Sequence, residues 1–147
     1  MTDVYAQELL IKKFLELEGL TKVKLNDEDE SEEYTYPEVA LPNETFTRPE
    51  DGYWYELNPI PGKPVQIELG SEARSRWAGI FQVNICVPRN SGREALNDRF
   101  EAVAALFRSG LIIEGVRIRR TYSSSALEDG DFRVLPVTIE WWSDLDR

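Results

Sequence analysis

Hydrophobic residues near the start of the chain recur every three or four positions, which is the spacing of one face of a helix. The pattern predicts a helix that begins after Thr2, runs to about Glu18 and stops at Gly19. A helix with one apolar face must cover a hydrophobic core. That face consists of Ala6, Leu10, Phe14 and Leu17, widened by Ile11 and Leu15.

From Tyr34 onward, apolar and polar residues alternate with the period of two that is typical of strands. Residues 34–42 can form only an edge strand or an extended arm, because they contain Pro37 and Pro42. Three alternating segments follow, and we expect them to form a meander with one buried face. They are residues 53–60, 65–70 and 75–88, and the buried face of the last consists of Trp77, Phe81, Val83, Ile85 and Val87.

A second helical pattern begins after residue 92, and we expect Gly110 to end it. Its apolar stripe consists of Leu96, Phe100, Val103 and Phe107. Two more alternating segments follow. The first alternates Val116 and Ile118 with Arg117 and Arg119, and the second alternates Leu135, Val137, Ile139 and Trp141 with Thr138, Glu140 and Trp142.

This order of helix, strands, helix and strands predicts an α+β fold. We expect a single domain over residues 1–147, with a mainly antiparallel or mixed β-sheet and two principal helices packed on it. No internal repeat is visible in the sequence.

The net charge of the chain limits the classes of molecule that it can bind. Lysine and arginine total 17 against 27 aspartate and glutamate residues, so the net charge is −10. Such a chain repels phosphate backbones, which disfavours specific binding to nucleic acid. Residues 26–33, NDEDESEE, form an acidic block that we expect to be a mobile loop, because it lacks the glycine and the terminal glutamate of a calcium loop in register.

We expect the protein to remain in the cytoplasm and away from membranes. No apolar run approaches the length of a membrane-spanning helix, and the first residues resemble neither a signal peptide nor a transit peptide. The single cysteine, Cys86, allows no internal disulfide and suits a reducing compartment.

Residue types that carry catalysis are scarce. The chain has no histidine, so the commonest general base and zinc ligand are missing. Cys86 lies inside a predicted strand, so we expect it to be a buried structural thiol. Carboxylates are abundant, but none stands at a spacing that singles it out. We therefore assign no catalytic, cofactor-binding or metal residue, and keep a carboxylate-based, metal-dependent enzyme only as an alternative.

Arginine pairs suggest an interaction surface instead. Arg117 and Arg119 project from one strand face, while Arg74 and Arg76 flank the start of the long strand. On an acidic protein, such pairs suit bidentate contacts with carboxylates of another subunit. Solvated strand edges explain the same pattern equally well. Trp54 alternates with its tyrosine neighbours, so we expect its ring outside the main core, where exposed Trp and Arg favour an interface.

Two segments resemble those of a known family. One is NETFTRPEDGYW, an Asn-x-x-Phe-x-x-Pro motif that leads into an aromatic strand. The other is GIFQVNICVPRNSGREALNDRFEAVAALF, with Gly-x-x-Gln-Val-x-Ile-x-x-Pro before a helix that ends in phenylalanine. Together they resemble the tail terminator-like family of long-tailed bacteriophages and prophages, in element order over residues 1–142. The acidic block 26–33 is not part of that pattern.

The resemblance implies a small α+β subunit that assembles into a six-membered ring. Such a ring caps the growing tail tube, halts its polymerisation and offers a surface for joining the head. The implied partners are further copies of the chain, the tail tube protein and head-neck connector proteins, with no cofactor. The implied location is the host cytoplasm during assembly and then the tail-neck region of the virion. Another neck or minor tail structural protein is the alternative within the same class.

The resemblance also assigns roles within TFTRPEDGYWYEL, residues 45–57. Phe46, Tyr53 and Tyr55 are read as core and strand-packing residues. Arg48 and Trp54 are candidates for a subunit edge. The full set of candidate interface residues is Arg48, Trp54, Arg74, Arg76, Arg117 and Arg119.

Overall fold

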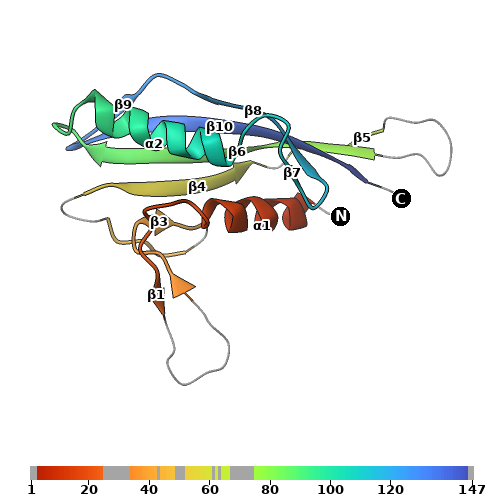
Figure 1. Ribbon diagram of the computed structural model, residues 1–147, viewed down its shortest axis with the longest axis horizontal. Coiled ribbons are helices and arrows are strands. Elements are labelled where there is room, and N and C mark those ends of the chain that lie inside the picture. The colour runs from red at the N-terminus through yellow and green to blue at the C-terminus, as the bar shows by residue number, and fades with distance from the viewer. Residues whose placement is uncertain are drawn as a thin grey trace.

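The computed structural model describes residues 3–24, 34–42, 44–48, 52–60, 62, 64–66 and 75–145. These residues contain two helices and ten strands, arranged as Figure 1 shows. The elements are α1 (Asp3–Phe14), β1 (Val23–Lys24), β2 (Tyr34–Thr35), β3 (Val39–Ala40), β4 (Trp54–Ile60), β5 (Pro64–Gln66), β6 (Ser75–Pro88), α2 (Arg93–Leu106), β7 (Ile112–Ile113), β8 (Val116–Ser123), β9 (Leu127–Asp129) and β10 (Phe132–Leu145).

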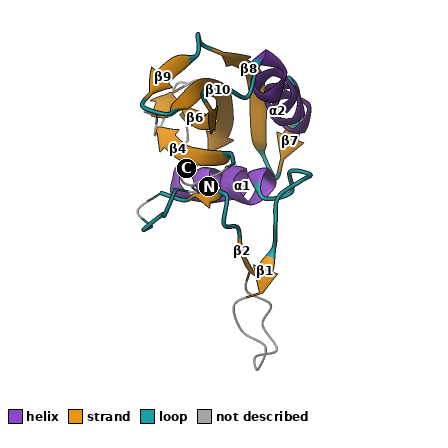
Figure 2. Ribbon diagram, turned by 90° about the vertical axis from the view of Figure 1, so that its left-hand side faces the viewer, coloured by secondary structure: helices purple, strands orange, loops and turns teal. Residues whose placement is uncertain are grey.

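One eight-stranded sheet dominates the fold. Its main path runs β3-β4-β6-β10-β8-β7, with β5 paired to β6 and β9 paired to β10. All pairs in it are antiparallel except β3 and β4, so the sheet is mixed. β1 and β2 form a separate two-stranded sheet, the β1–β2 hairpin, which extends away from the body (Figures 1 and 2). The predicted α+β class is confirmed.

The long strands β6 and β10 form the middle of the sheet. They pair without interruption from Ser75 opposite Leu145 to Pro88 opposite Phe132. The last strand of the described chain therefore lies between β6 and β8 rather than at an edge.

The expected meander is wrong in one respect. β4 and β5 both pair with the same edge of β6 and run in the same direction, so they lie end to end. The register shifts by one residue between Ile60 opposite Ile80 and Pro64 opposite Trp77. Gly62 lies at this interruption, and a Cβ atom there would lie 1.3 Å from the Ala78 carbonyl oxygen, so only glycine lets the two backbones approach.

The core lies between the sheet and both helices, which cover the same sheet face (Figure 2). The predicted stripe of α1 is buried, with Leu10 and Phe14 fully inaccessible. The predicted strand faces are buried as well: Phe81, Val83, Ile85 and Val87 on β6, Val116 and Ile118 on β8, and Leu135, Val137, Ile139 and Trp141 on β10. Burial of each such side chain contributes about 1.5–3 kcal/mol.

Three helix details differ from the sequence expectations. α1 ends at Phe14, and the chain continues through tight turns in which the Leu17 amide donates to the Phe14 carbonyl at 2.9 Å. α2 ends at Leu106, so Gly110 serves the following turn, where its amide donates to the Ile118 carbonyl at 2.8 Å. Phe100 is only partly buried, unlike Leu96, Val103 and Phe107.

Candidate functional site

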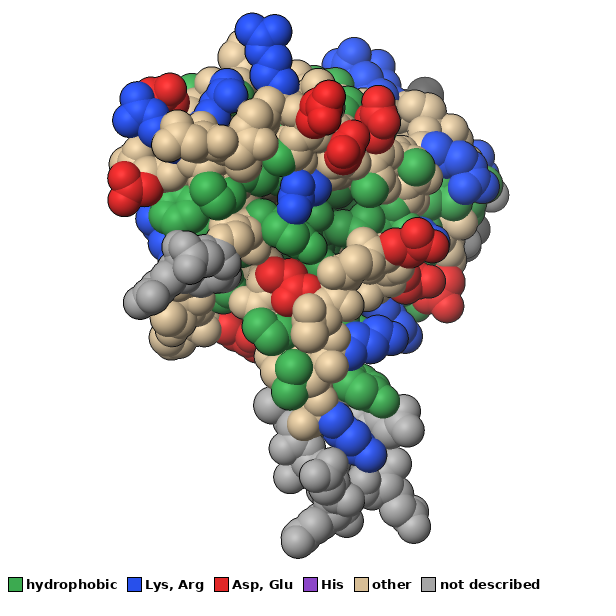
Figure 3. Space-filling view, turned by 60° about the vertical axis from the view of Figure 1, so that its left-hand side comes forward, with side chains coloured by type: hydrophobic (Ala, Val, Ile, Leu, Met, Phe, Trp, Pro, Cys, Tyr) green, Lys and Arg blue, Asp and Glu red, His purple; other side chains and the backbone are tan. Residues whose placement is uncertain are grey.

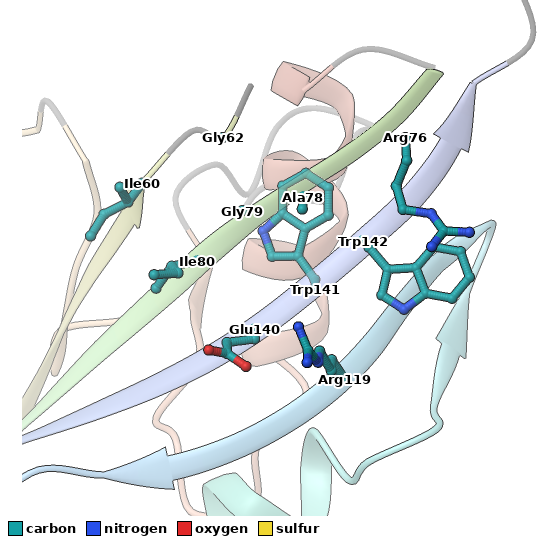
Figure 4. Close-up of a pocket in the computed structure, with 10 residues that line it drawn as sticks. All are labelled: Ile60, Gly62, Arg76, Ala78, Gly79, Ile80, Arg119, Glu140, Trp141 and Trp142. Carbon is teal, nitrogen blue, oxygen red and sulfur yellow. The ribbon is translucent and has the colours of Figure 1, made fainter. Parts of the chain in front are cut away.

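The sheet face that the helices leave uncovered, here called the open face, carries a hollow of about 640 Å³ near the β5 end of the molecule (Figure 4). Ile60, Ala78 and Ile80 supply apolar surface to it. Arg76, Arg119 and Trp142 also line it, from three different strands. We call this feature the Trp142 hollow.

Strand register brings two predicted arginines to Trp142. Arg117 on β8 lies directly opposite Trp142 on β10, and its guanidinium carbon lies 4.9 Å from the ring centre. Arg76 comes from the other neighbouring strand, β6, with its guanidinium carbon 4.1 Å from the ring centre (Figure 4). Each such cation–π contact contributes about 0.5–1 kcal/mol at an exposed site.

An ion pair holds Arg76 in this position. Its Nε atom donates to Asp144 Oδ1 at 2.9 Å, directly across the β6–β10 pairing. Both side chains are partly exposed, so the pair itself contributes at most about 1 kcal/mol. Its effect on the site is to keep the guanidinium plane against the indole.

A β-bulge determines where Arg119 lies. Glu140 pairs with Arg120, but the next residue of β10, Trp141, pairs with Ile118, so Arg119 has no opposite residue. Bulges redirect the side chain of the extra residue. Arg119 lines the hollow, and within the described residues neither it nor Arg117 forms an ion pair.

Glu140 is occupied by another arginine. Arg120 binds it bidentately through Nε to Oε2 and through a guanidinium nitrogen to Oε1 at 3.1 Å. These hydrogen bonds hold the pKa of the Glu140 carboxyl below its usual value, with the charges of Arg120 and Arg119 acting in the same direction. The carboxylate within the hollow is therefore already paired, and the Arg119 charge remains available to another molecule.

Arg48 and Trp54 lie at the other end of the sheet, away from the hollow. The Arg48 guanidinium carbon lies 5.4 Å from the Trp54 ring centre, and Arg48 pairs with Asp129 at 3.7 Å. Trp54 lies on the open face, outside the main core cluster, as the alternation predicts. It is nevertheless only 1% exposed, because its ring packs edge-on against Phe132, with the two ring centres 4.4 Å apart. The expectation that Trp54 is exposed at a subunit edge is therefore wrong.

Of the remaining aromatics of that stretch, Tyr53 and Tyr55 pack as the sequence interpretation expects, whereas Phe46 is not part of the core cluster. Tyr55 is buried in the core cluster, where its ring contacts Phe14 edge-on with centres 5.2 Å apart. Tyr53 is partly buried against the same cluster and carries Arg99 over its ring at 3.7 Å. Phe46 is partly buried in a loop.

Two sequence predictions lie outside the described residues. These are Arg74, one of the six candidate interface residues, and the acidic block 26–33.

Cys86 behaves as a structural residue. It is 1% exposed and lies opposite Trp54 in the β4–β6 pairing. Burial raises the pKa of its thiol to about 12, so the reactive thiolate form is disfavoured at neutral pH. The described residues contain no group of three or more acidic, cysteine or histidine side chains that could hold a metal ion. No helix within these residues is long and apolar enough to span a membrane.

Trp142 and the apolar surface around it were missed as site residues by sequence reasoning. Because successive side chains of a strand point to opposite faces, Trp142 must point away from the core face that Trp141 occupies. This alternation is a signal in the sequence for an exposed aromatic residue. The register that brings Arg76 and Arg117 to it depends on pairing between distant segments, which local patterns do not encode.

Comparison with known proteins identifies a family that matches most of this chain. A family model described as phage tail terminator protein matches residues 21–141. This range contains all of β4, β6 and β8, and it contains β10 as far as Trp141. A solved chain known only by a sequence identifier has 19% identity and a TM-score of 0.60, over 96% of both chains, and so shares the fold. A chain from the virion of a native gene transfer agent particle has 15% identity and a TM-score of 0.44, over 74% of this chain and 79% of that one. No curated protein matches.

Proposed function

This chain belongs to the phage tail terminator protein family, and we propose that copies of it close into a ring on the end of the tail tube and stop the tube from growing. The observation that carries the proposal is the family match, which spans 121 residues from 21 to 141. A protein of this family is a structural component of the phage tail, so its action depends on contacts rather than on catalysis.

We propose six copies in the ring, as the sequence resemblance implies, with the tail tube protein on one side and head-neck connectors on the other. Assembly takes place in the host cytoplasm, and the ring remains at the junction of tail and neck in the virion. The net charge of −10 supports this role, because a ring around the path of DNA must not retain phosphate groups.

The surface also supports an assembly role. One sheet face is covered by both helices, whereas the open face carries exposed arginines and the half-buried Trp142. Tryptophan and arginine are the residue types that contribute most to protein interfaces. Figure 3, which shows the other end of the molecule, has a band of hydrophobic side chains between charged groups, so the surface offers apolar contacts on more than one side.

Tube polymerisation tests the proposed function directly. Purified tail tube protein is polymerised with and without this chain, and tube lengths are measured by electron microscopy. We expect the chain to cap tube ends and to give shorter, uniform tubes. Unchanged lengths with no bound protein would contradict the proposal. Binding at tube ends without any effect on length would instead favour another neck or minor tail component.

A further inference from the structure

We propose that the Trp142 hollow binds the acidic block 26–33 of a neighbouring copy of this chain. The inference rests on the proposed function, because it specifies how one copy joins the next. It concerns a segment that lies outside the two motifs that carry the family resemblance.

The hollow has unbalanced positive charge. Among the described residues, Arg76, Arg119 and Glu140 line it. Arg117 lies against Trp142, Arg120 pairs with Glu140 and Asp144 pairs with Arg76, so these six side chains together carry a charge of 4 − 2 = +2. Arg120 and Arg76 are the two that pair with those carboxylates. Arg117 and Arg119 have no carboxylate partner among the described residues. They are therefore placed to receive carboxylates from outside.

The acidic block supplies the complementary charge. NDEDESEE contains six carboxylates and no cation, so it accounts for −6 of the net −10 of the chain. The other residues together carry only −10 + 6 = −4. The negative charge of the protein is thus concentrated in one short segment, and arginine side chains bind carboxylates bidentately.

The described hairpin on either side of the block favours a contact with another molecule. It joins the two strands of the β1–β2 hairpin, in which Lys24 pairs with Tyr34. The hairpin forms its own small sheet and extends away from the body that carries the hollow (Figures 1 and 2). Val23 on the hairpin is 43% exposed, so the hairpin also offers apolar surface to a neighbour.

Hairpin and hollow are different patches of the surface, so a contact between them is heterologous. Each copy then offers one hairpin to the next copy and one hollow to the previous copy. Heterologous contacts generate closed rings when the rotation between copies closes, whereas a self-complementary patch gives only dimers. The proposed contact therefore suits a ring.

The test mixes two full-length variants. The hollow variant carries Arg117→Glu and Arg119→Glu. The block variant carries Asp27→Asn, Glu28→Gln, Asp29→Asn, Glu30→Gln, Glu32→Gln and Glu33→Gln. Each variant alone lacks one half of the contact, so we expect the dissociation constant for self-association to rise by more than about tenfold. Sedimentation velocity across protein and salt concentrations measures this, after thermal unfolding has shown that both variants fold.

The mixture gives the decisive result. The intact block of the hollow variant can bind the intact hollow of the block variant, so we expect one-to-one heterodimers that do not grow further. A matched control carries Arg93→Glu and Arg108→Glu, which reverse two exposed arginines on and just after α2, and should self-associate as the wild type does.

Three outcomes would overturn the inference: a mixture that stays monomeric, a block variant that self-associates like the wild type, or a wild type that is monomeric at every concentration. Failure of the proposed function is visible separately. If the wild type does not cap tail tubes, the function is wrong, while heterodimers in the mixture still support the contact. If the block variant caps tubes normally, the contact is wrong and the function stands.

Discussion

Trp142 lies directly opposite Arg117 in the β8–β10 pairing, and the Arg117 guanidinium carbon lies 4.9 Å from the centre of the indole ring. Arg76 approaches the same ring from the neighbouring strand on the other side. An aromatic ring flanked by two cations is partly shielded from water and keeps one orientation. This arrangement makes Trp142 the fixed element of the hollow and the arginines its charged rim.

Reversing the charge of Arg117 and Arg119 should separate assembly from folding. Both side chains are exposed on the face opposite the core, so Arg117→Glu with Arg119→Glu should leave the fold intact. It should weaken assembly by a few kcal/mol, because attraction to carboxylates becomes repulsion. Thermal unfolding and complementation of tail assembly measure the two effects. Normal tail length in a folded variant would show that these arginines are ordinary surface residues.

The two adjacent tryptophans should respond differently to truncation. Trp141 is 2% exposed in the core, so Trp141→Ala should cost roughly 3–5 kcal/mol of stability. Trp142 is only partly buried, so Trp142→Ala should cost clearly less but should weaken self-association. Chemical denaturation and sedimentation of both variants make the comparison. Equal losses of stability would mean that Trp142 is a core residue.

The two phenylalanines of the α2 stripe differ in the same way. Phe107 is fully buried and contacts Phe81 edge-on, with ring centres 5.8 Å apart, so Phe107→Ala should cost roughly 3–5 kcal/mol. Phe100 is partly buried, so Phe100→Ala should cost less than that range. Urea unfolding of both variants tests the order, which would be contradicted if Phe100→Ala were the more damaging change.

Gly79 should not tolerate a side chain. It lies opposite Trp141, and a Cβ atom at this position would lie 2.7 Å from the indole ring. Gly79→Ala should therefore destabilise the protein by about 1–3 kcal/mol, as overpacking does. Ala78→Ser, one residue away on the exposed face, is the control and should change little. A neutral Gly79→Ala would mean that the ring can shift without loss.

Acid should weaken the Arg120–Glu140 pair. The pKa of Glu140 is held below its usual 4.5 by hydrogen bonds from Arg120. Because the folded pKa is the lower one, the pair stabilises the fold above the unfolded-state pKa and is lost as the pH falls through the folded value. Glu140→Gln should therefore differ most from the wild type at neutral pH and converge with it as the pH falls through the lowered folded-state pKa of Glu140. Melting curves at several pH values, with Glu101→Gln on the exposed side of α2 as control, test this.

Local periodicity was sufficient for much of the fold. The spacing of Leu10 and Phe14 and the alternation of Val116 with Arg117 depend only on the geometry of one helix or one strand, and both predict burial correctly. The meander expected for residues 53–60 and 65–70 does not form, because β4 and β5 run in the same direction along β6. Their end-to-end placement depends on the close approach of Gly62 to Ala78 on another strand.

The candidate site was only partly predictable for the same reason. Exposure of Arg117 and Arg119 follows from alternation, but the bulge at Arg119 and the contacts of Trp142 follow from pairing with β10. For Trp54, alternation predicts the correct face of the sheet but the wrong exposure. Phe132, which is distant in sequence, covers the Trp54 ring and removes it from the surface.

The central place of β10 also has a consequence for the order of folding. β6 and β8 each need β10 for the hydrogen bonds of one edge, and β10 follows both of them in the chain. During synthesis, the ribosome therefore releases both of these strands before their shared partner exists. Until residues 132–145 emerge, two unpaired strand edges are open to other chains, and such edges promote aggregation. Sheet closure is thus a late event in the life of each newly made subunit, and it depends on contacts that are distant in sequence and slow to form.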